Sequence, residues 1–231
     1  MGKGLAVRFR VKLACGLIAL AGLGACGNDK GEPSPMGTVV GGVAKATLAK
    51  VKGRRAPAPV AAAPATRADI EKFGIPILRA VIPARGADAL VTISDSKGDI
   101  VTWATTDGTT FTLRGGVLSQ TRGLGPDLMS AAVPSVADLA RNGGTHRRSY
   151  FFLGGDDRST RRDYDCTVAV VGKETIVIFA RAHAALHVTE ECIRPEGKIT
   201  NDFWLEGAAI RKSRQWTSPG TGYIAFEKVV D

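Results

Sequence analysis

Alternation of apolar and polar residues with a period of two is the feature that most constrains the fold of this chain. Between residues 100 and 114 the sequence reads IVTWATTDGTTFTLR, in which Phe111 and Leu113 alternate with threonines and an arginine. Successive side chains of a β-strand point to opposite faces, so this pattern gives a strand one apolar face. Asp107 and Gly108 form a dipeptide that favours a tight turn between antiparallel strands. The segment therefore predicts a β-hairpin.

The same period recurs along most of the chain after residue 66. A second hairpin is predicted from Cys166–Val171 and Glu174–Ala180, with Gly172 and Lys173 as its turn. Short helices are expected after Thr66 and Ser135, each followed three residues later by an aspartate that completes a capping-box pattern. Further strands are expected at 90–94, 116–120, 148–153, 185–190, 200–206, 208–216 and 223–229. This pattern predicts an all-β domain, an antiparallel sandwich or partly closed barrel with one or two short helices.

A secretory signal followed by a lipidation motif occupies the first 26 residues. An uncharged run rich in leucine and alanine follows four basic residues, Lys3, Arg8, Arg10 and Lys12, which is the pattern of a signal peptide. About 13 uncharged residues are too few to span a bilayer, which needs roughly 20. The run ends in Leu-Gly-Ala-Cys, the bacterial lipobox. We expect residues 1–25 to be removed and Cys26 to carry the lipid.

Residues 26–65 are expected to form the lipidated N-terminus and a flexible tether. They are rich in glycine, proline, alanine and lysine, a composition that buries little apolar surface. Gly27 follows the lipidated cysteine, where an aspartate would favour retention at the inner membrane. The sequence therefore predicts lipid anchoring in the outer membrane, on its periplasmic face. A single folded domain is expected at 66–231.

Charge and compartment together limit the partners of this domain. The signal peptide contains four basic and no acidic residues, so its removal lowers the formal net charge from +9 to +5. Nucleic acid is not expected as a partner in the periplasm. A modest positive field favours anionic polysaccharide and lipid headgroups instead.

Two cysteines are left to pair in the folded domain. Cys15 leaves with the signal and Cys26 is acylated, so Cys166 and Cys192 remain. In an oxidising compartment two remaining cysteines usually form a disulfide. Their spacing is not C-x-x-C, the pattern of redox motifs and of many metal sites. We therefore predict a structural disulfide between them.

The glycine-rich stretch SQTRGLGPDLMS at 119–130 has two readings. It lacks the Lys-Ser/Thr pair of a phosphate-binding loop, and its G-x-G has no third glycine. In the first reading, Arg122 with Asp127 presents a guanidinium to a carboxylate of a glycan or partner. In the second, the two residues form an internal ion pair, Pro126 begins a short helix, and Leu128 packs inward.

Other candidate sites are weaker. His183 and His187, followed by two glutamates, are spaced like metal ligands but lack the H-E-x-x-H glutamate, so neither a metal site nor a cofactor is predicted. No G-x-S-x-G elbow is present, and no catalytic constellation stands out. The three tryptophans suit core positions or sugar stacking. Trp216 is the best candidate for an exposed ring because basic and polar residues surround it, Arg214 and Gln215 among them.

Three blocks of sequence resemble the YjbF/GfcB family of lipoproteins. They are TRGLGPDLMSA at 121–131, VTWATTDGTTFTLRGGVL before it, and NDFWLEGAAIRKSRQW at 201–216. The likeness extends from about Thr66 to Val229. Such proteins are linked to production or export of exopolysaccharide and group 4 capsule, alongside an outer-membrane β-barrel and a periplasmic export protein. The resemblance implies an accessory lipoprotein with an all-β fold, and it brings no catalytic residues.

These observations favour a non-enzymatic accessory factor in assembly or export of exopolysaccharide or capsule. It would bind the glycan or an export partner, with Arg122, Asp127, Arg214, Gln215 and Trp216 as candidate contacts. One alternative is a periplasmic lyase or hydrolase that uses Arg122 with nearby carboxylates. The other is a purely structural partner of an outer-membrane barrel. An enzyme requires a cleft where titratable groups converge, and a glycan binder requires an exposed aromatic face with a basic rim.

Overall fold

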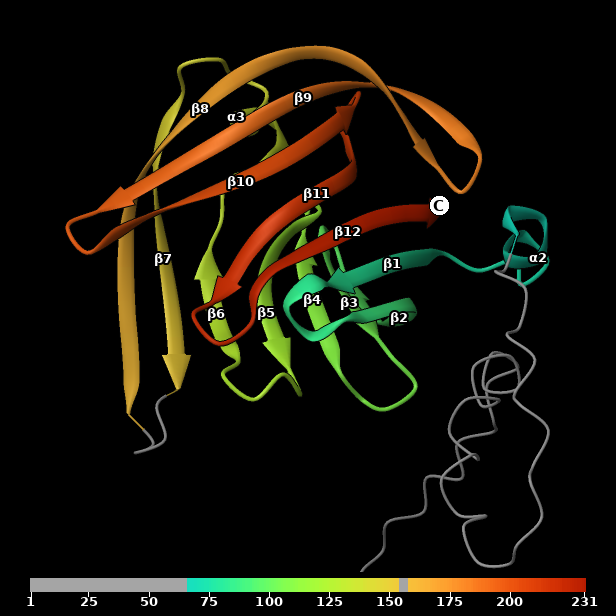
Figure 1. Ribbon diagram of the computed structural model, residues 1–231, viewed down its shortest axis with the longest axis horizontal. Helices are drawn as coiled ribbons and strands as arrows, with labels where there is room; N and C mark the ends of the chain where they lie inside the picture. The colour runs from blue at the N-terminus through green and yellow to red at the C-terminus, as the bar shows by residue number, and fades with distance from the viewer. Residues whose placement is uncertain (1–65, 154–157) are drawn as a thin grey trace, which may run out of the picture. The chain divides into compact units, whose positions relative to one another are not determined.

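Twelve antiparallel strands form a single curled sheet in the computed structural model, which describes residues 66–153 and 158–231 (Figure 1). Their order in the sheet is β5-β4-β3-β2-β1-β12-β11-β10-β9-β8-β7-β6. The two edge strands, β5 and β6, are consecutive in the chain and lie next to each other, so the sheet curls into a nearly closed barrel. The all-β prediction, with a partly closed barrel among its forms, is confirmed.

The strands vary in length from five to twenty residues. Their bounds are β1 Ile77–Ile82, β2 Ala87–Lys97, β3 Ile100–Ala104, β4 Thr110–Arg114, β5 Val117–Arg122, β6 Leu128–Ala132, β7 Thr145–Leu153, β8 Ser159–Ile178, β9 Arg181–Arg194, β10 Gly197–Glu206, β11 Ala209–Ser218 and β12 Gly222–Val230. The helices are α2 Arg67–Glu71, α3 Val136–Leu139 and the 3-10 turn η1 Pro83–Arg85.

Both short helices begin where the capping boxes predict. The side chains of Thr66 and Ser135 accept hydrogen bonds from the backbone N–H groups of Asp69 and Asp138, and each aspartate bonds back to its cap residue. These reciprocal bonds satisfy backbone donors that a helix start leaves free. The hairpin predicted around Asp107 and Gly108 is present as β3 and β4.

The second hairpin prediction is wrong in its turn. Gly172 does not end a strand; it lies at a bulge in β8, and the ladder with β9 continues beyond it. The chain reverses instead at Phe179 and Ala180, which have φ angles of 45° and 64°. Residues other than glycine rarely adopt this region, so the sequence carries no conventional turn signal there. The β8–β9 hairpin is therefore much longer than predicted.

Two further elements differ from expectation. Pro126 does not start a helix, because the following residues form strand β6, in which Leu128 is fully buried. Strand β1 was not predicted, although it lies at the centre of the sheet between β2 and β12. Both of its faces are largely buried, which removes the polar alternation that marks a half-exposed strand.

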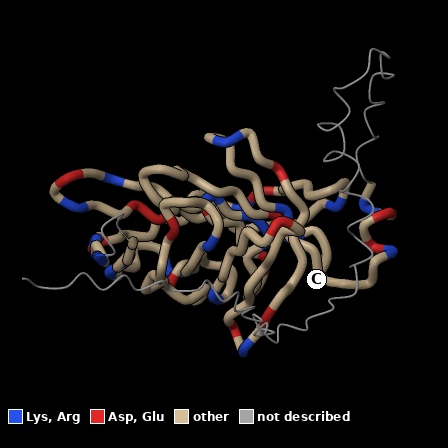
Figure 2. The backbone as a smooth tube through the Cα atoms, turned by 90° about the horizontal axis from the view of Figure 1, so that it is seen from below, with Lys and Arg blue, Asp and Glu red and all other residues tan. Residues whose placement is uncertain are grey.

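Side chains from many strands of the sheet form apolar clusters in the interior. One cluster contains Trp103, Phe111, Tyr150, Trp216 and Phe226 among other residues. Another involves helix α3 and includes Leu139, Val188 and Phe203. Figure 2 shows acidic and basic residues interspersed along the described part of the backbone.

Cys166 and Cys192 form the predicted disulfide across the long hairpin. They are directly opposite in the β8–β9 ladder, and their sulfur atoms are 2.07 Å apart. Closing a loop between residues separated by 26 positions stabilises the fold by roughly 3.5 kcal/mol in the chain-entropy account. The disulfide thus links β8 and β9, two strands whose alternate side chains are buried.

The signal peptide, Cys26 and the tether lie outside the described residues. Within the part of the chain that the structure describes, no helix is long and apolar enough to cross a membrane.

Candidate functional site

The glycine corner between β5 and β6 is held by the carboxylate of Asp127. This carboxylate accepts hydrogen bonds from the N–H groups of Gly123 at 2.9 Å and Leu124 at 3.1 Å, and from the Thr121 hydroxyl at 2.9 Å. The Thr121 oxygen in turn accepts from the N–H of Leu128 at 2.9 Å. Gly123 and Gly125 have φ angles of 87° and 84°, which glycine adopts without strain. The backbone N–H groups of Gly123, Leu124 and Leu128 thus donate to side-chain oxygens within the corner.

Arg122 lies at the same corner and bonds to the backbone. One of its amino groups donates to the carbonyl oxygens of Thr121 at 2.7 Å and Leu128 at 3.3 Å. The ion pair with Asp127 that the second reading predicts is not formed. Asp127 accepts from two backbone N–H groups and the Thr121 hydroxyl, whereas Arg122 donates to two backbone carbonyls. The rest of the Arg122 side chain is exposed. Arg122 and Asp127 therefore brace the point where the barrel closes.

Gln215 completes this closure from the opposite side of the barrel. Its side-chain oxygen accepts from the N–H of Leu118 at 2.8 Å, and its amide nitrogen donates to the carbonyl of Gly116 at 3.0 Å. Both backbone groups belong to or adjoin β5, an edge strand. Unpaired backbone groups at a buried edge are costly. Gln215 therefore replaces part of the missing strand partner.

Trp216 lies inside the barrel. Its ring centroid is 5.2 Å from that of Tyr150 and 5.9 Å from that of Phe152, in edge-to-face packing. The residue is 9% exposed. Arg214 differs from it, because the Arg214 side chain is 48% exposed on the outer face of the sheet. The five candidate contacts therefore separate into the corner pair, two interior residues, and Arg214 outside.

A charged cluster that the sequence did not indicate lies in the interior. Glu190 is fully buried, and its two oxygens are 2.6 Å from the Arg148 guanidinium and 2.6 Å from His146 Nε2. Asn201 donates to the same carboxylate at 2.6 Å. Burial alone would raise the pKa of Glu190, but Arg148 and the two hydrogen-bonding neighbours outweigh it and lower this pKa. The carboxylate is therefore held in its charged form.

The same cluster contains the phenol of Tyr150, whose hydroxyl has no hydrogen-bond partner among the described residues. Tyr150 is fully buried, and burial raises its pKa to about 12. His146, Cys166 and Glu190 place ligand atoms within 4.8 Å of one another. Cys166 is committed to the disulfide and Arg148 occupies the carboxylate, so these donors do not fit a metal ion. The arrangement is that of a buried ion pair with hydrogen-bonding neighbours.

His183 and His187 make separate contacts. His183 is buried and lies 3.1 Å from a carboxylate oxygen of Glu206. His187 is half-buried and lies 3.3 Å from Asp202. The two imidazoles thus have different carboxylate partners despite their spacing of four residues.

One surface combines aromatic rings with charged groups, and we call it the outer strip. It crosses the outer face of β8 to β12 and consists of Glu174, His187, Asp202, Trp204, Lys212, Arg214 and Tyr223. On β10 its residues alternate with buried Asn201, Phe203 and Leu205, which places Trp204 on the outer face. On β11 its residues flank buried Ser213.

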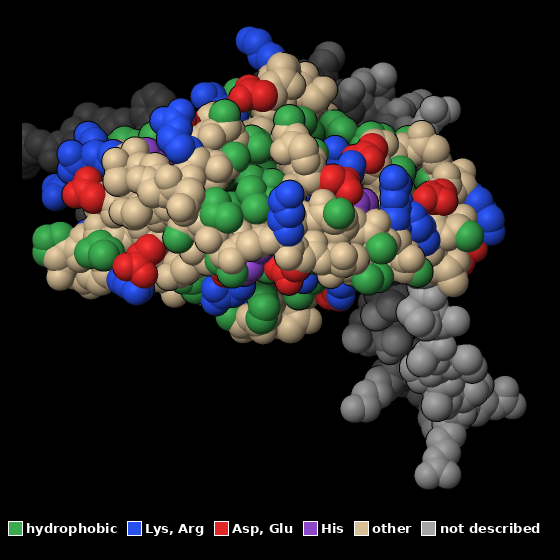
Figure 3. Space-filling model, turned by 90° about the horizontal axis from the view of Figure 1, so that it is seen from above, with side chains coloured by type: hydrophobic (Ala, Val, Ile, Leu, Met, Phe, Trp, Pro, Cys, Tyr) green, Lys and Arg blue, Asp and Glu red, His purple; other side chains and the backbone are tan. Residues whose placement is uncertain are grey.

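Contacts link the members of the outer strip. The Trp204 ring stacks on His187 with centroids 4.5 Å apart, and the Lys212 ammonium lies 5.1 Å from the indole centroid. The Arg214 guanidinium lies 3.6 Å from the centre of the Tyr223 ring, and one of its nitrogens is 3.7 Å from Asp202. Figure 3 shows one face of the molecule, on which basic, acidic and apolar side chains are interspersed. The strip offers half-buried rings beside cations and carboxylates.

Comparison with solved structures identifies the fold. The chain is similar to the hypothetical lipoprotein YmcC from Escherichia coli (K12), with a TM-score of 0.64 and 19% sequence identity. The similarity covers 72% of this chain and 89% of that chain. No curated protein matches the chain. The chain thus shares the fold of that structure.

The sequence places the chain in a protein family. Residues 49–229 match the family described as group 4 capsule polysaccharide lipoprotein GfcB, YjbF. The chain belongs to this family, and the resemblance of the three sequence blocks is confirmed. Membership of a lipoprotein family implies a lipid anchor, and the family description names no enzymatic activity.

Proposed function

We propose that the chain is an outer-membrane lipoprotein that assists the assembly or export of an extracellular polysaccharide. Its membership of the capsule lipoprotein family over residues 49–229 carries this proposal. The lipobox at Cys26 and the glycine after it support an anchor in the outer membrane, with the barrel on the periplasmic side. Acyl chains on one residue provide a stable attachment without a spanning helix.

The domain would act by binding the glycan along the outer strip. Indole and phenol rings suit the apolar faces of sugar rings, and a guanidinium suits the carboxylate of an acidic sugar. Arg214 combines both features, because it is half-exposed and lies over Tyr223. Trp204 lies two strand positions from Asp202, the carboxylate that contacts Arg214. The rings of Trp204 and Tyr223 thus belong to the same surface, the outer strip.

Arg122 has a smaller part in this proposal. Arg122 is exposed, and among the described residues both of its hydrogen bonds come from one guanidinium nitrogen. The other nitrogens would contact a glycan or an export protein at the glycine corner. The outer-membrane barrel and the periplasmic export protein linked to such lipoproteins are the candidate protein partners.

Replacing Arg214 by alanine is expected to weaken polysaccharide binding by about tenfold, because both the guanidinium and its stacked arrangement are lost. The measurement is calorimetric titration of the full chain with size-fractionated extracellular polysaccharide from the organism that carries it. Arg161→Ala is the matched control, since Arg161 is also exposed and lies 5.7 Å from an aromatic ring centroid, that of Phe151. Equal losses in the two variants would show nonspecific charge attraction and contradict the assignment of the outer strip.

A further inference from the structure

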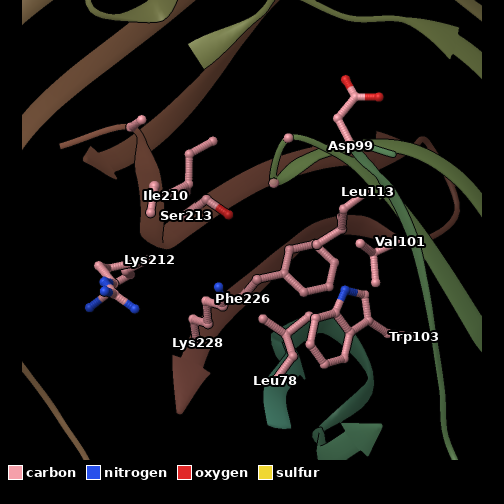
Figure 4. Close-up of a pocket in the computed structure, with 15 residues that line it drawn as sticks. Leu78, Asp99, Val101, Trp103, Leu113, Ile210, Lys212, Ser213, Phe226 and Lys228 are labelled. Carbon is pink, nitrogen blue, oxygen red and sulfur yellow. The ribbon is translucent and has the colours of Figure 1, made fainter. Parts of the chain in front are cut away.

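An apolar cavity opens at one end of the barrel. Its volume is about 240 Å³, which exceeds the roughly 150 Å³ of an apolar cavity that admits benzene. Its apolar wall is formed by Leu78, Val101, Trp103, Leu113, Ile210 and Phe226. Figure 4 shows the Trp103 and Phe226 rings beside Leu78, Val101 and Leu113, with Ile210 and Ser213 across the space. The cavity therefore separates β11 from the β3–β4 wall of the barrel.

Close packing around a glycine shapes one side of the cavity. Gly116 has a φ angle of 90°, and a Cβ atom added there would lie 3.0 Å from Cβ of Ile210. A larger residue would push Ile210 toward the opposite wall. The glycine thus lets β11 approach the β4–β5 turn while the space beside it stays open.

Most polar side chains around the cavity have partners among the described residues, and the Asp99 carboxylate lies at its exposed rim. Ser213 is a buried polar residue of the lining, and its hydroxyl accepts a hydrogen bond from the Gln215 amide at 2.9 Å. At the rim, Lys228 pairs with Asp231 at 3.0 Å and Lys212 lies 3.7 Å from Glu227. The interior therefore offers dispersion contacts and burial to a ligand, and little hydrogen bonding.

The opening of the cavity lies at the end of the barrel where the described part of the chain begins. It lies where β1 begins and β12 ends, because the lining contains Leu78 near the start of β1 and Lys228 near the end of β12. Helix α2 precedes β1 at this end of the barrel. About 40 residues separate Cys26 from Thr66, and a fully extended chain of that many residues has a maximum length of roughly 130 Å. The distance along the chain therefore allows a lipid on Cys26 to reach this end.

We propose that this cavity binds an alkyl chain of the kind that acylates lipoproteins and membrane lipids. The chain would lie between Trp103, Phe226 and Ile210, with its polar end at the charge-balanced rim. Two sources supply this chemistry, the chain's own lipidated Cys26 and a separate acylated molecule. The site is distinct from the outer strip and does not depend on glycan binding there.

The test titrates dansylaminoundecanoic acid, a fluorescent fatty-acid analogue, into the full chain with the substitution Cys26→Ala, which removes the lipidation site. Binding is measured by the fluorescence of the directly excited dansyl group. We expect saturable binding that unlabelled dodecanoic acid displaces. Val101→Trp and Ile210→Trp, which narrow the cavity from opposite walls at half-buried positions, should each weaken binding by about tenfold. Val177→Trp is the control, because Val177 is 65% exposed on β8, and it should bind as Cys26→Ala alone does.

Acylated protein purified from membranes distinguishes the two sources. Binding of the probe to this form indicates a separate acylated ligand, whereas loss of binding indicates that the protein's own anchor fills the cavity. Circular dichroism and thermal unfolding verify that each variant folds, and either cavity variant suffices for the comparison. Absence of saturable binding to the Cys26→Ala chain, or equal binding by the cavity variants and Val177→Trp, would overturn the proposal.

Discussion

Replacing Glu190 by glutamine is expected to destabilise the fold by about 3–5 kcal/mol, the cost of leaving a buried charge without its partner. Arg148 is 1% exposed, and the Glu190 carboxylate is its charged partner at 2.6 Å. Urea unfolding of the full chain measures the change. Glu191→Gln is the matched control, because Glu191 is the neighbouring residue and pairs with Lys198 at the surface, where an ion pair is worth at most about 1 kcal/mol.

The pH dependence of this loss has a defined direction. The pKa of Glu190 is lower in the folded chain than its usual value of 4.5. Its stabilising contribution is therefore fully present above about pH 4.5 and declines as the pH falls through the lower, folded value. The difference between wild type and Glu190→Gln should shrink in acid. A double variant, Arg148→Met with Glu190→Leu, should recover much of the stability. Equal stability of Glu190→Gln and Glu191→Gln at neutral pH would contradict this account of the cluster.

Replacing Gln215 by alanine is expected to cost about 2–4 kcal/mol. The change leaves the N–H of Leu118 and the carbonyl of Gly116 without their side-chain partner, and each buried unpaired group costs about 1–3 kcal/mol. Hydrogen exchange of the β5 amides, together with urea unfolding, measures the effect. Because Gln215 contacts the edge strand, loss of protection should be largest in β5.

Gln120→Ala is the matched control for this prediction. Gln120 is a half-buried glutamine on β5 itself, so the same side-chain change is made on the same strand. We expect it to alter the free energy of unfolding by less than about 1 kcal/mol. If the two variants lose the same stability, Gln215 does not close the sheet edge as the geometry indicates.

Much of the fold follows from local signals in the sequence. The alternation around Phe111 and Leu113, the Asp-Gly turn and both capping boxes depend on neighbouring residues, and all are present in the structure. The length of the β8–β9 hairpin does not follow from such signals. A glycine at position 172 suggests a turn, but Gly172 pairs with His187 beside a bulge in β8. The actual reversal uses Phe179 and Ala180 at positive φ, between the paired residues Ile178 and Arg181.

The site was less predictable because its residues come together across the barrel. Arg148 and Glu190 are separated by 42 positions and share no motif. Basic neighbours suggested an exposed Trp216, but an irregularity in the β11–β12 register follows this residue, and its ring lies inside. The phase of the alternation on β10 would have indicated Trp204 as the outward-facing indole. Of the outer strip, only Arg214 was among the five candidate contacts, although Trp204 was one of the three tryptophans considered for sugar stacking.

Measuring polysaccharide export by living cells directly tests whether the outer strip serves this export. Cells that lack the chain are complemented with wild type, with the double variant Trp204→Ala and Arg214→Ala, or with Arg161→Ala, and surface polysaccharide is measured at equal protein abundance. We expect export by the outer-strip variant to fall toward the level of cells without the chain, whereas Arg161→Ala restores export. Full export by the outer-strip variant would show that the outer strip does not serve polysaccharide export.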